Sequence, residues 1–282
     1  MIMIHEDPER VVYHYTSPEG LLGMVTNRNI WSTDVRYLSD ASEFKYTLTL
    51  AEHELDEFRA TCTDAHSEAL LINELLLSLT RAPRSRLYVA SFSSEKNRLS
   101  QWRAYCPATG GFSAGIKSGA LGAASRNRLL PCIYDEAEQH RLFAWVLSQI
   151  LDRYRAGKPA LRFAPEHPDP FAGYTEDFLG GVLLLAASFK HPSFREESEW
   201  RLVTQRAPNG EPLPLYRTGR SGIVPYIETP LSLRKEPTQI HEIIVGPNPH
   251  EDLAREAVES LLHSHGIDHT GVHLSGIPYR TW

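Results

Sequence analysis

The sequence predicts an α+β fold, in which a mixed β-sheet is combined with helical insertions. Segments with strand and helix patterns alternate only irregularly along the 282 residues, and the strand segments are short. A doubly wound parallel sheet would show a regular alternation instead. The chain has no internal repeat and no low-complexity tract. We therefore expect a single domain over residues 1–282, with a helical insertion at about 42–82.

The first third of the chain predicts a strand, a short helix, a second strand and then two helices. Val11 to Tyr15 is β-prone, and Ser17-Pro18 supplies a cap and a first residue for a helix. Ile30 to Thr33 has the pattern of a strand. Apolar residues at helical spacing predict one helix from Ser42 to about Cys62 and a Leu-rich helix from about Asp64 to Leu79. These two helices form the expected insertion.

The same two periodicities predict the remaining elements. Leu87 to Ser93 alternates as a strand does. An apolar stripe from Phe143 to Tyr154 predicts a helix over Glu136 to Arg155. We expect further strands at 112–116, 129–134, 199–204, 240–245 and 272–279, and further helices at 174–189 and 253–262.

Composition excludes several classes of protein. A net charge of -6 gives no basic surface for bulk attraction to nucleic acid. Three scattered cysteines suit a reducing compartment and argue against a structural zinc site. The first residues lack the pattern of a signal peptide, and the most apolar stretch, Val182 to Ala187, is far shorter than the ~20 residues of a membrane helix. We expect a cytoplasmic protein without a membrane partner.

The strong motifs of known cofactor and catalytic sites are missing from the sequence. It has no phosphate-binding loop, no dinucleotide fingerprint, no His-Glu-x-x-His and no nucleophile elbow. His263-Ser264-His265 offers possible metal ligands, but it also suits the polar end of a helix, where a cationic His favours the helix dipole. We therefore expect no metal.

Several separated stretches carry a family resemblance. The chain resembles the family catalogued as domain of unknown function 2971, whose hallmarks extend over nearly the whole length. Ser39 departs from the Asn expected in such families. The hallmarks stand here as His14-Tyr15-Thr16, Asp40 to Glu43, Ser91-Phe92-Ser93, Trp102 to Tyr105, Lys190-His191 and Glu199 to Arg201.

The order of these residues is also similar to the ADP-ribosyltransferase superfamily. There, an early strand supplies His or Arg, a central strand supplies Ser, Thr or Tyr, and a later strand supplies Glu. The similarity implies a split, mixed β-sheet with NAD as the substrate in its cleft. It makes Glu199 and His14 the candidate catalytic residues. The residues implied in binding NAD are Thr16, Ser91, Trp102, Tyr105 and Arg201.

The chemistry of NAD cleavage fits these residue types. Breaking the bond between nicotinamide and ribose builds positive charge on the sugar, which the carboxylate of Glu199 could stabilise. The imidazole of His14 could hydrogen-bond a ribose hydroxyl. Tyr105, or Trp102, could stack on the nicotinamide ring. Arg201 lies two residues from Glu199, hence on the same strand face, where it could hold the carboxylate or contact a phosphate.

Each assignment has a purely structural alternative. His14 could be a buried histidine with satisfied hydrogen bonds, and Glu199 with Arg201 could form a solvated ion pair of little energetic worth. Ser91 could be a small core residue, and the aromatic pair, Trp102 and Tyr105, could be packing residues. The Asp40 to Glu43 turn also matches a helix capping box.

Two functions remain open from the sequence. The first is an NAD-consuming enzyme, of the kind found among bacterial toxins and phage-defence effectors, that hydrolyses NAD or transfers ADP-ribose to a protein or nucleic acid acceptor. The second is a non-catalytic module that recognises a nucleotide or peptide, with Trp102 and Tyr105 as stacking platforms. A nuclease is disfavoured because no clustered carboxylates suggest a two-metal site.

Overall fold

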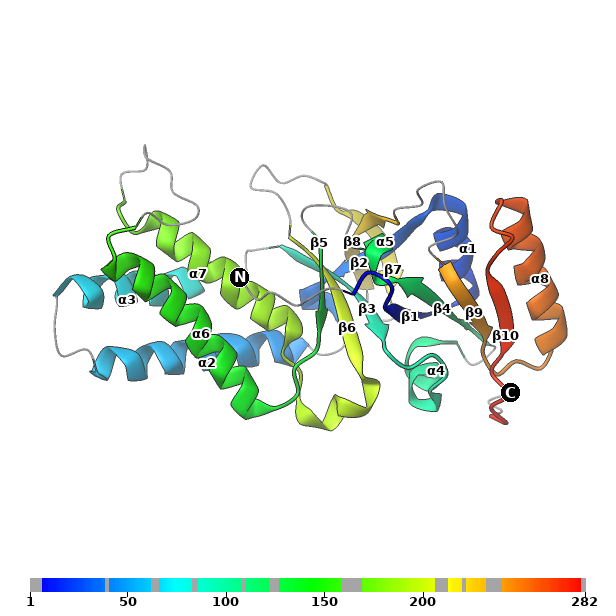
Figure 1. Ribbon diagram of the computed structural model, residues 1–282, viewed down its shortest axis with the longest axis horizontal. Coiled ribbons are helices and arrows are strands. Elements are labelled where there is room, and N and C mark those ends of the chain that lie inside the picture. Colours follow the sequence, from blue (N-terminus) through cyan, green and yellow to red (C-terminus); the bar gives the residue numbers. More distant parts are fainter. Residues whose placement is uncertain are drawn as a thin grey trace. The chain divides into compact units, whose positions relative to one another are not determined.

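The computed structural model describes residues 7–38, 41–61, 66–82, 86–107, 110–121, 127–158, 169–205, 213–219, 222–231 and 240–279 (Figure 1). The chain divides into two compact units. The β-sheet unit consists of Met1–Asp34, Tyr88–Pro131 and Arg195–Trp282, and the helical unit consists of Val35–Leu87 and Cys132–Phe194. The expected insertion at about 42–82 lies inside the helical unit. The single domain over 1–282 stays a prediction.

The β-sheet unit contains a ten-stranded sheet of order β10-β9-β4-β1-β3-β2-β8-β7, in which β6 pairs with both β3 and β5. β9 and β10 are parallel, whereas β1 is antiparallel to both β3 and β4. This mixed, open sheet confirms the α+β class. The strands are β1 (Val11–Thr16), β2 (Asn29–Asp34), β3 (Leu87–Ser93), β4 (Phe112–Lys117), β5 (Asn127–Pro131), β6 (Glu199–Gln205), β7 (Leu215–Gly219), β8 (Gly222–Pro230), β9 (Ile240–Val245) and β10 (Gly271–Leu274).

Four helices belong to the β-sheet unit: α1 (Pro18–Asn27), α4 (Leu99–Tyr105), α5 (Ser118–Leu121) and α8 (Glu251–Ser264). The start of α1 is as predicted, because the hydroxyl of Ser17 accepts a hydrogen bond from the backbone N–H of Gly20 at 3.2 Å. The helix ends at Arg28, whose φ of 54° is left-handed and cannot continue the helix.

The central strands of this sheet have two faces with different surroundings, because successive side chains of a strand point to opposite sides. We call the first the α1/α8 face: here Val12, Phe92 and Leu202 share a core cluster with residues of α1 and α8. We call the second the α4 face: here Tyr13 and Tyr15 pack against Trp102 of α4.

The helical unit is built from helices that pack around one apolar core. Leu55, Leu71, Phe143 and Phe178 are fully buried in it, and the rings of Phe143 and Phe178 meet edge to face with centroids 6.0 Å apart. Of the part of the chain that the structure describes, no helix is both long and apolar enough to cross a membrane. The elements are η1 (Val35–Tyr37), α2 (Ala41–Thr61), α3 (His66–Leu79), α6 (Glu136–Arg155) and α7 (Ala172–Ser188), followed by η3 (Pro192–Glu197).

The structure departs from the prediction at several strands, and the strand expected at 129–134 is observed as Asn127–Pro131. The hairpin of β7 and β8 was not predicted, because its apolar Leu215, Tyr216 and Ile223 are solvent-exposed and Pro225 interrupts the strand pattern. The strand expected at 272–279 ends at Leu274, before Gly276, whose φ of 63° is incompatible with a strand. Cys62 and residues 63–65, which were assigned to helices, lie outside the described residues.

Candidate functional site

The fold brings the three predicted site strands together. β3 pairs with β1, and it also pairs with β6. His14 of β1, Ser91 of β3 and Glu199 of β6 therefore lie on directly paired strands, although they are far apart in the sequence. The predicted convergence of these three segments holds at the level of the backbone.

His14 lies next to the point where β1 pairs with β3. Tyr13 pairs with Ser93, and the Nδ1 atom of His14 lies 2.8 Å from the carbonyl oxygen of Ser91. A carbonyl oxygen can only accept, so Nδ1 must donate this hydrogen bond. The neutral ring then carries its lone pair on Nε2, which has no hydrogen-bond partner among the described residues.

The surroundings of His14 keep its ring neutral. Burial lowers the pKa of His14 below its ordinary value, and the hydrogen bond to Ser91 offsets this only in part. The ring also lies 5.5 Å from that of Phe92, centroid to centroid. His14 nevertheless retains some exposure to solvent. The residue thus offers a neutral acceptor at the sheet surface.

Glu199 and Arg201 form a buried, two-pronged ion pair. The guanidinium donates from Nε and from a terminal nitrogen to the two carboxylate oxygens, each at 3.0 Å. The side chains are only 4% and 3% exposed, so the solvated pair considered from the sequence is wrong. The prediction that Arg201 holds the carboxylate in place agrees with this geometry.

The side chains of His14 and Glu199 point to opposite faces of the sheet. Leu202 joins the core on the α1/α8 face, and Trp200 packs against the same cluster, so the alternating Glu199 and Arg201 point to the α4 face. His14 is two residues from Val12, which lies on the α1/α8 face. The structure therefore pairs the strands without bringing this imidazole and this carboxylate together.

The other predicted ligand contacts on β1 and β3 also separate by face. Thr16 lies on the side of His14, buried beneath α1, where a Cβ placed on Gly20 would lie 1.9 Å from its Oγ1. Ser91 contacts His14 through its backbone carbonyl, while its side chain points to the α4 face. Thr16 is thus a packing residue, and Ser91 orients the imidazole.

The aromatic candidates lie on α4 with different exposure. Trp102 is 3% exposed, its Nε1 donates to the Oδ1 of Asn97 at 2.9 Å, and its ring meets Tyr15 edge to face at 4.8 Å. Trp102 therefore has a packing role, which is its structural alternative to stacking on a ligand. Tyr105 is 39% exposed. The turn at Ser39 and Asp40 lies outside the described residues.

No signal in the sequence pointed to a polar cluster around the buried Glu242 on the α4 face, in which Lys96 and His273 are largely exposed. The hydroxyl of Tyr13 donates to Glu242 at 2.7 Å, and Lys96 and His273 approach the same carboxylate at 3.5 Å and 3.8 Å. Burial, followed by the Glu242 contact, raises the pKa of Tyr13. Four residues so distant in sequence leave no spacing signal, so only the fold shows this cluster.

Two groups of described side chains contain possible metal ligands, and they differ in their surroundings. His263 and His265 are engaged locally: His263 lies 2.6 Å from a carboxylate oxygen of Asp268, and His265 Nδ1 lies 3.0 Å from the carbonyl of Leu261. This supports the interpretation as a polar helix end. A surface group on α2, consisting of His53, Glu54 and Glu57, has its ligand atoms within 4.8 Å of one another. Exposed acidic groups of this kind are common without a metal.

Comparison with known proteins gives one family match. The family described as Protein of unknown function (DUF2971) matches residues 101–202. No curated protein and no solved structure matches the chain significantly. The matched segment contains three of the motifs on which the resemblance rests, namely Trp102 to Tyr105, Lys190-His191 and Glu199 to Arg201. The predicted family resemblance is confirmed over this segment, since residues 101–202 match the DUF2971 family.

Proposed function

We propose that the β-sheet unit is a recognition module for a nucleotide, with NAD as the first ligand to test. The observation that carries the proposal is the state of His14. Its Nδ1 is held by the Ser91 carbonyl, and its Nε2 is an acceptor without a partner among the described residues. A ribose hydroxyl is a matching donor.

The position of Glu199 favours recognition over turnover. A carboxylate that stabilises positive charge on the ribose must reach the sugar. The Glu199 carboxylate instead makes two hydrogen bonds to Arg201 and points to the α4 face, away from His14. A ligand held by Nε2 of His14 would therefore lack this carboxylate.

Calorimetric titration of NAD tests the proposal with two His14 variants. H14N keeps a nitrogen donor for the Ser91 carbonyl but removes the Nε2 acceptor, whereas H14A removes both. Losing one hydrogen bond should weaken NAD binding roughly three- to tenfold in H14N, without loss of the fold. The exposed His241 of β9 provides the matched control, since H241A should bind as the unchanged chain does. Equal NAD affinity in H14N, or no binding by the unchanged chain, would refute the proposal.

The NAD-consuming enzyme remains a second candidate, in the form of ADP-ribose transfer to a protein or nucleic acid, or of NAD hydrolysis. It is supported by the pairing of β3 with both β1 and β6, which places His14 and Glu199 on strands that both pair with the strand of Ser91. Release of nicotinamide from NAD, with and without cell lysate as a source of acceptor, separates the two candidates. An enzyme should release nicotinamide and lose this activity in E199Q while NAD affinity persists. A recognition module releases none.

A further inference from the structure

One turn of α2, in the helical unit, carries a cluster of side chains that can bind a metal ion. The ligand atoms of His53, Glu54 and Glu57 all lie within 4.8 Å of one another. Residues three and four apart are neighbours on a helix surface, so Glu57 lies beside both of the others. The Nε2 atom of His53 is 3.8 Å from a carboxylate oxygen of Glu57. Two ligand atoms of one tetrahedral zinc ion are roughly 3.4 Å apart, so small side-chain rotations would bring these atoms around one ion.

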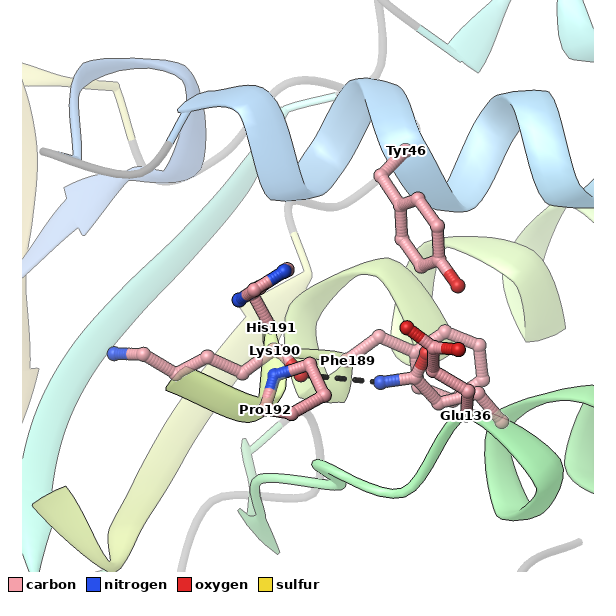
Figure 2. Close-up of a pocket in the computed structure, with 7 residues that line it drawn as sticks. Tyr46, Glu136, Phe189, Lys190, His191 and Pro192 are labelled. Carbon is pink, nitrogen blue, oxygen red and sulfur yellow. Dashed lines mark hydrogen bonds between the residues drawn. The ribbon is translucent and has the colours of Figure 1, made fainter. Parts of the chain in front are cut away.

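The carboxylate of Glu54 is held in place from a second helix. α2 and α6 pack against each other, and Figure 2 shows the hydroxyl of Tyr46 on α2 directed toward the carboxylate of Glu136 on α6, at a cavity of about 210 Å³. Farther along both helices, the Nδ1 atom of His140 lies 2.5 Å from the Oε1 atom of Glu54. An ionised carboxylate can only accept, so Nδ1 donates this hydrogen bond. Glu54 is therefore oriented by a partner, as carboxylates that bind metals usually are.

Exposure and charge both suit the approach of a cation to this cluster. The side chain of Glu54 is 21% exposed, whereas those of His53 and Glu57 are 64% and 67% exposed. An ion can therefore enter from solvent and rest against a partly buried carboxylate. Neither glutamate has an ion pair with a lysine or arginine among the described residues, and the nearby Arg59 pairs with Asp56 at 2.9 Å. Two carboxylate charges thus lack a permanently charged partner, which favours a divalent ion.

The donor set selects the kind of metal. One imidazole nitrogen and two carboxylate oxygens suit zinc and similar transition-metal ions, whereas calcium and magnesium take oxygen ligands. We infer that α2 binds a divalent transition-metal ion, with zinc as the probe, through His53, Glu54 and Glu57. His140 is a positioning residue, because it acts on the ion through Glu54. The site departs from the sequence-based expectation of no metal, and it belongs to the helical unit, whereas His14 belongs to the β-sheet unit.

Calorimetric titration of zinc chloride into the metal-free full chain tests the inference. One zinc ion should bind per chain at micromolar concentration, and H53A and E57Q, which each alter one exposed ligand, should weaken this binding at least tenfold. H263A is the matched control. His263 is also exposed and lies 2.6 Å from a carboxylate oxygen of Asp268, but no third ligand group adjoins the pair among the described residues. H263A should therefore bind zinc within twofold of the unchanged chain.

The same titrations separate a built site from adventitious binding. Zinc bound equally by the unchanged chain, H53A and E57Q, or weakened as much by H263A, would indicate binding at scattered histidines and would overturn the inference. An unchanged chain that binds no zinc at micromolar concentration would overturn it as well. Far-UV circular dichroism of each variant checks that these exposed substitutions leave α2 folded, so that a loss of affinity reports on the ligands.

Two variants of His140 test its positioning role. H140A removes the hydrogen-bond donor to Glu54 and should weaken zinc binding about tenfold. H140Q keeps a side-chain N–H donor and should recover most of the affinity, which a merely structural role of the imidazole would not explain. Equal zinc affinity in H140A and the unchanged chain, or no recovery in H140Q, would contradict the role assigned to His140.

Discussion

At the scale of single residues, His14 combines a structural and a recognition role. Its Nδ1 donates a hydrogen bond to the carbonyl of Ser91 and so helps to satisfy this backbone acceptor. The same bond fixes the tautomer and leaves Nε2 as an acceptor. The structural alternative and the recognition proposal are therefore compatible, because they use different nitrogen atoms of one ring.

The lowered pKa of His14 predicts a stability that falls in acid. The unfolded chain, with an ordinary pKa of about 6.5, takes up the proton more readily than the folded chain. The stabilisation is therefore fully present above pH 6.5 and is lost as the pH falls toward the folded pKa. Urea unfolding between pH 5 and 7.5 should show a steeper loss for the unchanged chain than for H14N. A difference between the two that does not vary with pH contradicts the lowered pKa.

The buried ion pair of Glu199 and Arg201 predicts that removing one partner lowers the stability strongly and that replacing both partners restores most of it. Removing one partner strands the other charge in a buried site, so E199A should lower the free energy of unfolding by roughly 3–5 kcal/mol. Replacing both residues by Met restores apolar packing and should recover most of that loss. Denaturant unfolding of the single and double variants measures both effects. A loss below about 1 kcal/mol in E199A would show that the pair is not structural.

At the scale of elements, the packing of α1 on β1 depends on a glycine. A Cβ on Gly20 would meet the Oγ1 of Thr16 at 1.9 Å, whereas a Cβ on Gly23 would meet nothing within 4 Å. G20A should therefore destabilise the chain by about 1–3 kcal/mol through overpacking. G23A, in the same helix, should stabilise it by up to about 1 kcal/mol through helix propensity. Thermal unfolding of both variants checks this, and equal melting temperatures would contradict the contact.

The elements that the sequence predicts best combine a long periodic pattern with a local start signal. The helix over 136–155 is observed with both bounds as expected, because its apolar stripe faces the core and Asp135 caps it by accepting from the N–H of Glu138 at 2.9 Å. β7 and the start of β8 carry exposed Leu215, Tyr216 and Ile223, so the alternation of buried and exposed residues is weak there. Their pairing with each other and with β2 shows only in the fold.

The candidate site also shows what residue spacing can and cannot predict. Spacing within one strand correctly predicts that Glu199 and Arg201 share a face, and they form an ion pair. Spacing cannot tell which residues of one strand share a sheet face with given residues of a paired strand, because that depends on the register and pairing of the two strands. The strands that carry His14 and Glu199 both pair with β3, as the order of the motifs led us to expect, whereas the opposite directions of their side chains could not be predicted.

At the scale of the whole molecule, each compact unit is assembled from separate stretches of chain. The expected insertion at about 42–82 supplies α2 and α3, but the core of the helical unit also needs α6 and α7 from beyond residue 132. Leu55 and Leu71 would lose their partners Phe143 and Phe178 without them. Ligand effects can therefore be assigned to one unit only by point variants in the full chain, as with H14N.

The nitrogen NMR shifts of the His14 ring, in protein labelled at its histidines, test the central claim most directly. The signal that disappears in H14N is that of His14. At pH 7 we predict a protonated Nδ1 and an unprotonated Nε2, whose resonance moves when NAD is added because a hydrogen bond forms at that atom. A ring protonated on Nε2, or an Nε2 resonance that stays in place at saturating NAD, would contradict the account.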